Sequence, residues 1–165
     1  MADGEKEVDA FHAALPAVPK DAYWGSNPAA SVLAVAVPYV DGEIAYRKGQ
    51  KDVAVAKLRE AVVLEDALKY DEPPPWTVPT RQALGAALIG SRRYVEAEAV
   101  YRADLKRYPE NGWSLRGLAQ ALEAQGKGAE AAAVKARLAK AWTRSDVSVD
   151  SSCLCIRPDA KGQRP

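Results

Sequence analysis

Apolar side chains recur along this chain at the three- and four-residue spacing of amphipathic helices, and clusters of turn-forming residues separate the recurrences. The pattern predicts six helices in three pairs, at residues 27–48, 53–68, 79–89, 94–107, 112–125 and 129–142. Asn27 is placed to cap the first helix, Pro28 to occupy its first turn and Gly49 to end it. Pro38 lies inside that helix and should kink or break it.

The segments outside these helices have a different character. Residues 69–77 contain three consecutive prolines, which fix the backbone and remove hydrogen-bond donors, so a stiff, polyproline-like connection is expected there. Residues 1–26 are expected to form a poorly ordered leader, and residues 146–165 a flexible tail. The helical domain therefore spans residues 27–145.

Residues 78–145 repeat themselves with a period of 34 residues. The small and large apolar residues that recur in place are Leu84 with Leu118, Gly85 with Ala119, Leu88 with Leu122, and Ala97 with Ala131. A fixed period of this length is typical of stacked helical repeats. Small side chains at matching points would let paired helices approach closely, while the large ones fill the space between pairs.

The repeats resemble the tetratricopeptide repeat, a helix–turn–helix unit of 34 residues. The segment 78–111 carries the residues of that pattern at Leu84, Gly85, Leu88, Ala97, Tyr101 and Pro109. The segment 112–145 has Lys135 where the pattern has an aromatic residue, and the segment 35–68 keeps Gly42, Ala54, Leu58 and Ala61. The resemblance implies an all-α fold, a right-handed solenoid of about three helix–turn–helix pairs. The stretches Tyr70 to Trp76 and Asn111 to Trp113 are also similar to bacterial repeat proteins of unassigned role, which implies no activity.

The resemblance implies an interaction module, because the first helix of each pair lines a concave groove in such solenoids. The residues expected to face that groove are Tyr39, Glu43, Tyr46, Arg47, Gln82, Trp113, Arg116, Gln120 and Glu123. Aromatic and Arg side chains contribute much of the energy at protein interfaces, so Tyr46, Trp113 and Arg116 are the expected anchors. The alternative is that Trp113 packs at the start of its helix and that the other residues form a solvated face.

The expected partner is a peptide or another protein, or a second copy of the chain. A chaperone C-terminal carboxylate is not expected, because the family members that bind one use Lys, Asn and Arg at positions that Tyr39, Glu43, Ala83, Trp113 and Gly117 occupy here. Trp76 with its prolines forms either a docking edge for a partner or a plug between the first two helix pairs.

Cys153 and Cys155 suggest an alternative role in metal or thiol handling through the tail. Two thiolates are too few for a stable zinc site, and the sole histidine, His12, lies at the far end of the sequence, so no cofactor is expected. With one histidine, no Gly-rich phosphate loop and no Ser-His-Asp set that can be placed, the sequence predicts no enzyme activity.

Composition and charge narrow the class of protein further. Hydrophobic residues make up 48% and charged residues 27% of the chain, which is ordinary for a soluble globular protein. The net charge of +1 gives no electrostatic footprint for a nucleic acid. The apolar run at residues 29–39 is too short to span a bilayer, and the acidic N-terminal residues do not resemble a secretory signal. A cytoplasmic chain without membrane contact is therefore expected.

Overall fold

Helices account for most of the ordered backbone. The computed structural model describes residues 2–156, in which there are seven α-helices, one turn of 3-10 helix and two strands of two residues each. The all-α class expected from the sequence is confirmed. The chain divides into two compact units, unit 1 up to Thr80 and unit 2 from Arg81 onward, and each is described by itself.

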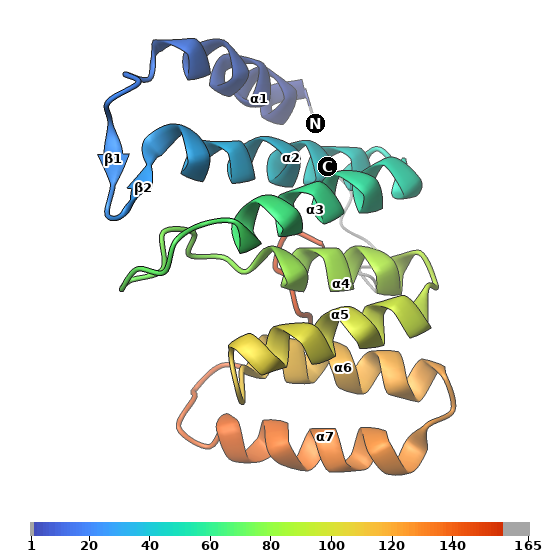
Figure 1. Cartoon of the computed structure of the whole chain (residues 1–165). Coiled ribbons are helices and arrows are strands. Elements are labelled where there is room, and N and C mark those ends of the chain that lie inside the picture. The colour runs from blue at the N-terminus through green and yellow to red at the C-terminus, as the bar shows by residue number, and fades with distance from the viewer. Residues whose placement is uncertain (1, 157–165) are drawn as a thin grey trace. The chain divides into compact units, whose positions relative to one another are not determined.

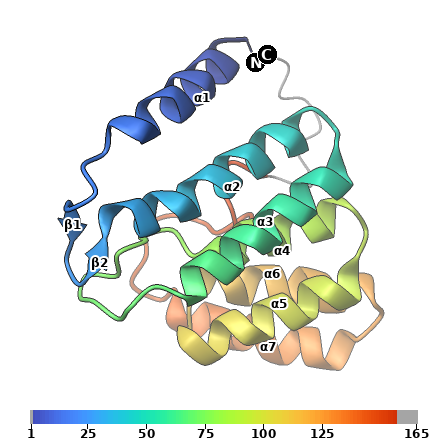
Figure 2. The same ribbon diagram turned by 45° about the horizontal axis from the view of Figure 1, so that its top comes forward.

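Unit 1 holds three helices and a small hairpin. Its elements are α1 (Ala2–Ala14), the 3-10 turn Leu15–Ala17, β1 (Tyr23–Trp24), β2 (Asn27–Pro28), α2 (Ala29–Arg47) and α3 (Lys51–Asp66). Helix α2 lies between α1 and α3 (Figures 1 and 2). The α2–α3 pair is close because Gly42 presents no side chain to Leu58; a Cβ atom there would lie 2.8 Å from the Leu58 Cγ.

Helix α2 ends as the sequence predicts but begins and continues differently. Gly49 adopts a positive φ of 77°, and the amides of Gly49 and Gln50 return to the carbonyls of Tyr46 and Ala45, which is the Schellman arrangement. The helix runs through Pro38 as one continuous element, so the expected break is wrong.

Asn27 does not cap α2, because Pro28 occupies the cap position. The Asn27 side chain instead bonds the backbone of Lys69, accepting from its amide at 2.8 Å and donating to its carbonyl at 3.0 Å. At the other end of the proline segment, the buried Glu65 carboxylate accepts from the Thr80 amide at 2.9 Å. The expected non-helical connection is thus confirmed, and buried side chains hold both of its ends.

The poorly ordered leader is corrected for residues 2–14, which form α1. This helix is mostly exposed. Its polar contacts include Glu5, which lies 2.5 Å from the Lys48 Nζ, and His12, whose Nε2 lies 3.2 Å from an Asp41 oxygen. Exposed pairs of this kind contribute about 0–1 kcal/mol each. Val8 and Phe11 are also half-buried on the same side of α1, but this apolar stripe is too short to predict a helix over residues 2–14.

Helix α2 is the one described helix that is long and apolar enough, by length and composition, to cross a membrane. Core helices of soluble proteins meet the same criterion, and 33% of the relevant stretch is buried inside the structure. The finding is weak support for a membrane span.

Unit 2 consists of four helices that follow one another by short turns. They are α4 (Thr80–Gly90, which starts on the last residue of unit 1), α5 (Tyr94–Arg107), α6 (Gly112–Ala124) and α7 (Gly128–Ala141). The chain reverses direction between consecutive helices, which stack in chain order (Figure 1). The predicted bounds of all four agree with the structure to within one residue.

Small residues line the packed faces of unit 2 as expected. Ala97 and Ala119 are fully buried, Ala131 is 2% exposed and Gly85 is buried as well. Larger side chains fill the space beside them, and Tyr101, Leu88, Leu118 and Leu122 are the main ones. The close approach of the helices therefore follows from residues that the 34-residue period singles out.

Candidate functional site

The residues expected to line a groove fall into the two units. Tyr39, Glu43, Tyr46 and Arg47 lie on α2 in unit 1, while Gln82 lies on α4 and Trp113, Arg116, Gln120 and Glu123 lie on α6 in unit 2. Tyr39 is 9% exposed and packs edge-on against the Trp76 ring, with 5.6 Å between the ring centroids. Tyr39 is therefore mainly a packing residue of unit 1.

Trp76 is half-buried against α2. Its indole Nε1 is buried and makes no hydrogen bond in the described part of the chain. The ring therefore serves at least as a packing element for Tyr39 in unit 1. Its use as a docking edge stays a prediction.

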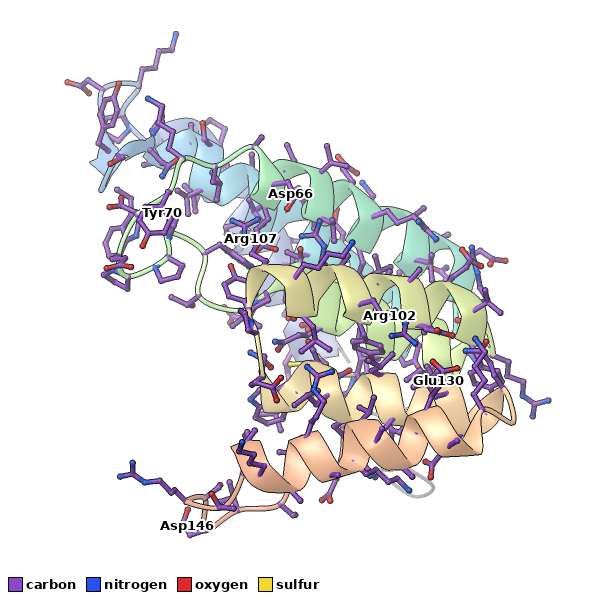
Figure 3. All side chains as sticks on the ribbon, turned by 60° about the horizontal axis from the view of Figure 1, so that its bottom comes forward. Asp66, Tyr70, Arg102, Arg107, Glu130 and Asp146 are labelled. Carbon is purple, nitrogen blue, oxygen red and sulfur yellow. The ribbon has the colours of Figure 1, made fainter. Side chains whose placement is uncertain are left out.

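The C-terminal segment, residues 146–156, is the main departure from the sequence-based expectation. Instead of a flexible tail over its whole length, it contains five buried residues, namely Val149, Ser151, Ser152, Cys153 and Ile156. Residues 157–165 of the predicted tail lie outside the described residues. Between its start at Asp146, labelled in Figure 3, and Ile156 the segment forms neither helix nor strand.

Two side chains of helix α6 bind one backbone carbonyl group of the C-terminal segment. The Arg116 Nε and the Gln120 Nε2 both donate to the backbone oxygen of Asp150, each at 3.4 Å. These two side chains are four residues apart and therefore lie on the same side of the helix. Both hydrogen bonds are long, so each contributes little energy by itself. Their role is to fix which carbonyl of the segment lies over α6.

A shorter and fully buried contact follows two residues later. The Ser152 hydroxyl donates to the Gln82 carbonyl oxygen of α4 at 3.1 Å and lies 2.6 Å from the Tyr101 hydroxyl. A serine has only one hydroxyl proton, which the Gln82 carbonyl takes up, so the Tyr101 hydroxyl must be the donor to Ser152. The result is a buried chain of hydrogen bonds that connects α5, the C-terminal segment and α4.

Tyr101 reaches the segment because two glycines make room for its ring. A Cβ atom added at Gly85 of α4 or at Gly117 of α6 would overlap the ring and hydroxyl of Tyr101. The tyrosine starts from α5 and passes between the two neighbouring helices at these points. Burial raises the pKa of Tyr101 far above its usual value, so the hydroxyl keeps its proton and stays a donor at physiological pH.

We call Gln82, Tyr101, Arg116 and Gln120 the α4–α6 face, since these residues contact the C-terminal segment. The tetratricopeptide resemblance named all four residues, Gln82, Arg116 and Gln120 as groove residues and Tyr101 as the aromatic of the repeat pattern. The sequence carried no signal that Tyr101 presents its hydroxyl to this face. That role depends on Ser152, which lies 51 residues further along the chain.

Trp113 packs within unit 2, as the alternative interpretation proposed. Its ring stands edge-on to Trp142 with 6.2 Å between centroids, and Asn111 caps the start of α6 by accepting from the amides of Trp113 and Ser114. The Trp142 Nε1 donates to the Val147 carbonyl at 2.6 Å, which positions the beginning of the C-terminal segment. Trp113 therefore acts on the segment indirectly, through Trp142.

Two further carboxylates have structural positions in unit 2. Glu123 is exposed and pairs with Lys135 of α7, so it does not belong to the α4–α6 face. Asp104 is 1% exposed, accepts from the Ser114 hydroxyl, and has a raised pKa because burial disfavours its charge. This buried pair joins α5 to the start of α6.

The two cysteines lie within the C-terminal segment. Both are thiols, and Cys153 is buried while Cys155 is exposed. The alternative role in metal or thiol handling stays a prediction.

Unit 1 contains one cleft that sequence reasoning missed, with a volume of about 520 Å³. Its lining includes His12 of α1 with Asp41 and Lys57. The His12 Nε2 lies 3.2 Å from one Asp41 oxygen, and the Lys57 Nζ lies 3.8 Å from the other. Because α1 was not expected, no sequence signal predicted the cleft. The His12 Nε2 is buried and lies close to Asp41, but it makes no hydrogen bond in the described part of the chain.

No protein-family model matches this chain, and a search of curated proteins found no similar sequence. Function is therefore inferred from the geometry of the α4–α6 face.

Proposed function

We propose that this chain is an interaction module of the tetratricopeptide type, built as a right-handed array of the pairs α2–α3, α4–α5 and α6–α7. It binds a non-helical segment of another protein, or of a second copy, on the α4–α6 face. The observation that carries the proposal is that this face already holds a non-helical segment of chain. It does so with side-chain donors directed at a backbone carbonyl and with one buried hydroxyl contact.

The chemistry of the face suits a peptide ligand. Every peptide offers carbonyl groups, so Arg116 and Gln120 supply an anchor that does not depend on sequence. The buried contact of Tyr101 and Gln82 with Ser152 adds a requirement for one particular side chain. A general anchor combined with one specific position is a common basis for selective peptide binding.

Arg116→Ala should weaken partner capture only about two- to threefold, because the 3.4 Å hydrogen bond that it removes contributes little energy by itself. The matched control is Arg137→Ala, since Arg137 lies on α7, pairs with Glu110 and is 45% exposed. The measurement is crosslinked affinity capture with the full chain, together with sedimentation at several concentrations to detect self-association. Equal capture by Arg116→Ala and Arg137→Ala would show that the α4–α6 face does not bind the partner.

A further inference from the structure

We infer that the C-terminal segment is a built-in competitor for the α4–α6 face, and that the outside ligand is a curved, non-helical peptide with serine where Ser152 lies. This inference rests on the proposed function and specifies its ligand. The segment supplies the template: its side chain at 152 is fully enclosed, and the neighbouring Ser151 and Cys153 are 5% and 7% exposed. A ligand must therefore have small residues at three consecutive positions.

The serine requirement follows from the buried hydroxyl groups. A ligand with alanine or a larger apolar residue at this position leaves the Tyr101 hydroxyl, which is fully buried, without an acceptor. An unsatisfied buried donor of this kind reduces affinity by about tenfold or more. A site that is built to hydrogen-bond a hydroxyl thus discriminates strongly against ligands that lack it.

Two buried apolar residues, Val149 and Ile156, lie on either side of the small residues 151–153. Val149 is 9% exposed and Ile156 is fully buried, whereas Leu154 between them is 63% exposed. The Ser151 hydroxyl donates to the Ile156 carbonyl at 3.1 Å, so the segment curves back over these positions. The ligand class is therefore a curved peptide with an apolar residue at each end and Ser-Ser-Cys, or similar small residues, between them.

The segment is held in a manner that permits release. Two of its contacts to α6 are 3.4 Å hydrogen bonds, and Asp150, Leu154 and Cys155 are exposed. Its covalent connection through the exposed residues 143–148 gives it a high effective concentration beside the face. An untethered peptide of equal intrinsic affinity must therefore bind the intact chain more weakly than a chain in which the tether is cut.

The test uses the full chain with a protease site inserted between Arg144 and Ser145, both exposed. The probe is a fluorescent peptide with the sequence of residues 146–156 under reducing conditions, and its anisotropy is measured with cut and uncut chain. The probe is expected to bind the cut chain at least tenfold more tightly. The Ser152→Ala peptide should bind about tenfold more weakly, and the Ser148→Ala peptide should bind normally, because Ser148 is exposed and contacts only the Asp150 side chain.

Several outcomes would overturn the inference. They are a probe that binds neither chain, equal binding to cut and uncut chain, normal binding of the Ser152→Ala peptide, and loss of helical circular dichroism on cutting. The last would mean that the segment is part of the fold and not a ligand. If any of these occurs while Arg116-dependent capture persists, the proposed function stands and the built-in competitor alone is rejected. If capture also fails, both proposals fall.

Discussion

Replacing Gly117 with alanine is expected to destabilise unit 2 by about 2 kcal/mol. In an ordinary helix this substitution would stabilise the helix, since alanine is favoured over glycine there by about 1 kcal/mol. Here the new Cβ would overlap the Tyr101 ring, and Gly85 on the opposite side leaves the ring no direction in which to move. Overpacking costs typically 1–3 kcal/mol, and the rigid surroundings place this case at about 3. The clash therefore outweighs the gain in helix propensity.

The matched control is Gly128→Ala at the start of α7, where nothing lies within 4 Å of the added Cβ. It should leave unit 2 unchanged or stabilise it by less than about 1 kcal/mol. Urea unfolding can be followed by the fluorescence of Trp113 and Trp142 in a chain with Trp24→Phe and Trp76→Phe, so that the signal comes from unit 2. Similar free energies of unfolding for the two alanine variants would show that Tyr101 does not pass between these helices.

Unit 2 is expected to lose about 2 kcal/mol of stability through Glu98 as the pH falls from about 5 to 2. The Glu98 side chain is 13% exposed and accepts from Lys127 at 2.7 Å, from Gln125 at 2.8 Å and from Arg102 at 2.9 Å. The hydrogen bond from Lys127 is the main cause that lowers the pKa of Glu98 to about 2. Arg102 also approaches Glu130 of α7 (Figure 3), so these ion pairs connect α5 to α7.

The sign of this change in unfolding free energy follows from where the folded and unfolded chains bind a proton at Glu98. The unfolded chain takes up a proton at Glu98 near the ordinary carboxyl pKa, while the folded chain takes it up only near pH 2. The stabilisation is therefore present above the unfolded pKa and lost as the pH falls toward the folded one. Full linkage would give about 3 kcal/mol, and screening of the half-exposed cations reduces this to about 2.

The measurement is the difference in unfolding free energy between wild type and Glu98→Gln at several pH values, with Glu130→Gln as the control. The difference isolates Glu98 from Asp104, whose raised pKa acts in the opposite direction. It should be about 2 kcal/mol at pH 7 and approach zero near pH 2, and it should be below about 1 kcal/mol for Glu130, which is 54% exposed. A difference that does not change with pH would contradict this assignment.

Much of unit 2 was predictable because its signals are local or periodic. Turn-forming residues mark the ends of α5, and the predicted range 94–107 coincides with the observed helix. The 34-residue period identified Gly85, Ala97, Ala119 and Ala131 as points of close approach, and all four are buried. Such features depend on the spacing of residues within one helix or one repeat, which the sequence displays directly.

The contacts of the C-terminal segment were not predictable by the same means. Ser152 meets Gln82 across 70 residues, and no periodicity distinguishes a polar segment that becomes buried by such a contact. Helix α1 was missed because its apolar stripe is short, with Val8 and Phe11 only half-buried, and because its ion pair of Glu5 with Lys48 leaves no periodic signal. Asn27 carries a valid cap signal, but a contact 42 residues away uses its side chain instead.

The most direct test of the α4–α6 face is a double-mutant cycle of Tyr101→Phe and Ser152→Ala, measured by unfolding of unit 2 in urea. Both hydroxyls belong to one buried chain of hydrogen bonds, so the two changes should interact by about 1 kcal/mol. Each single change should cost about 1–2 kcal/mol, and the double variant should cost less than their sum. Costs that add to within about 0.3 kcal/mol would mean that Ser152 does not lie against Tyr101 in solution. The assignment of the C-terminal segment to the α4–α6 face would then be wrong.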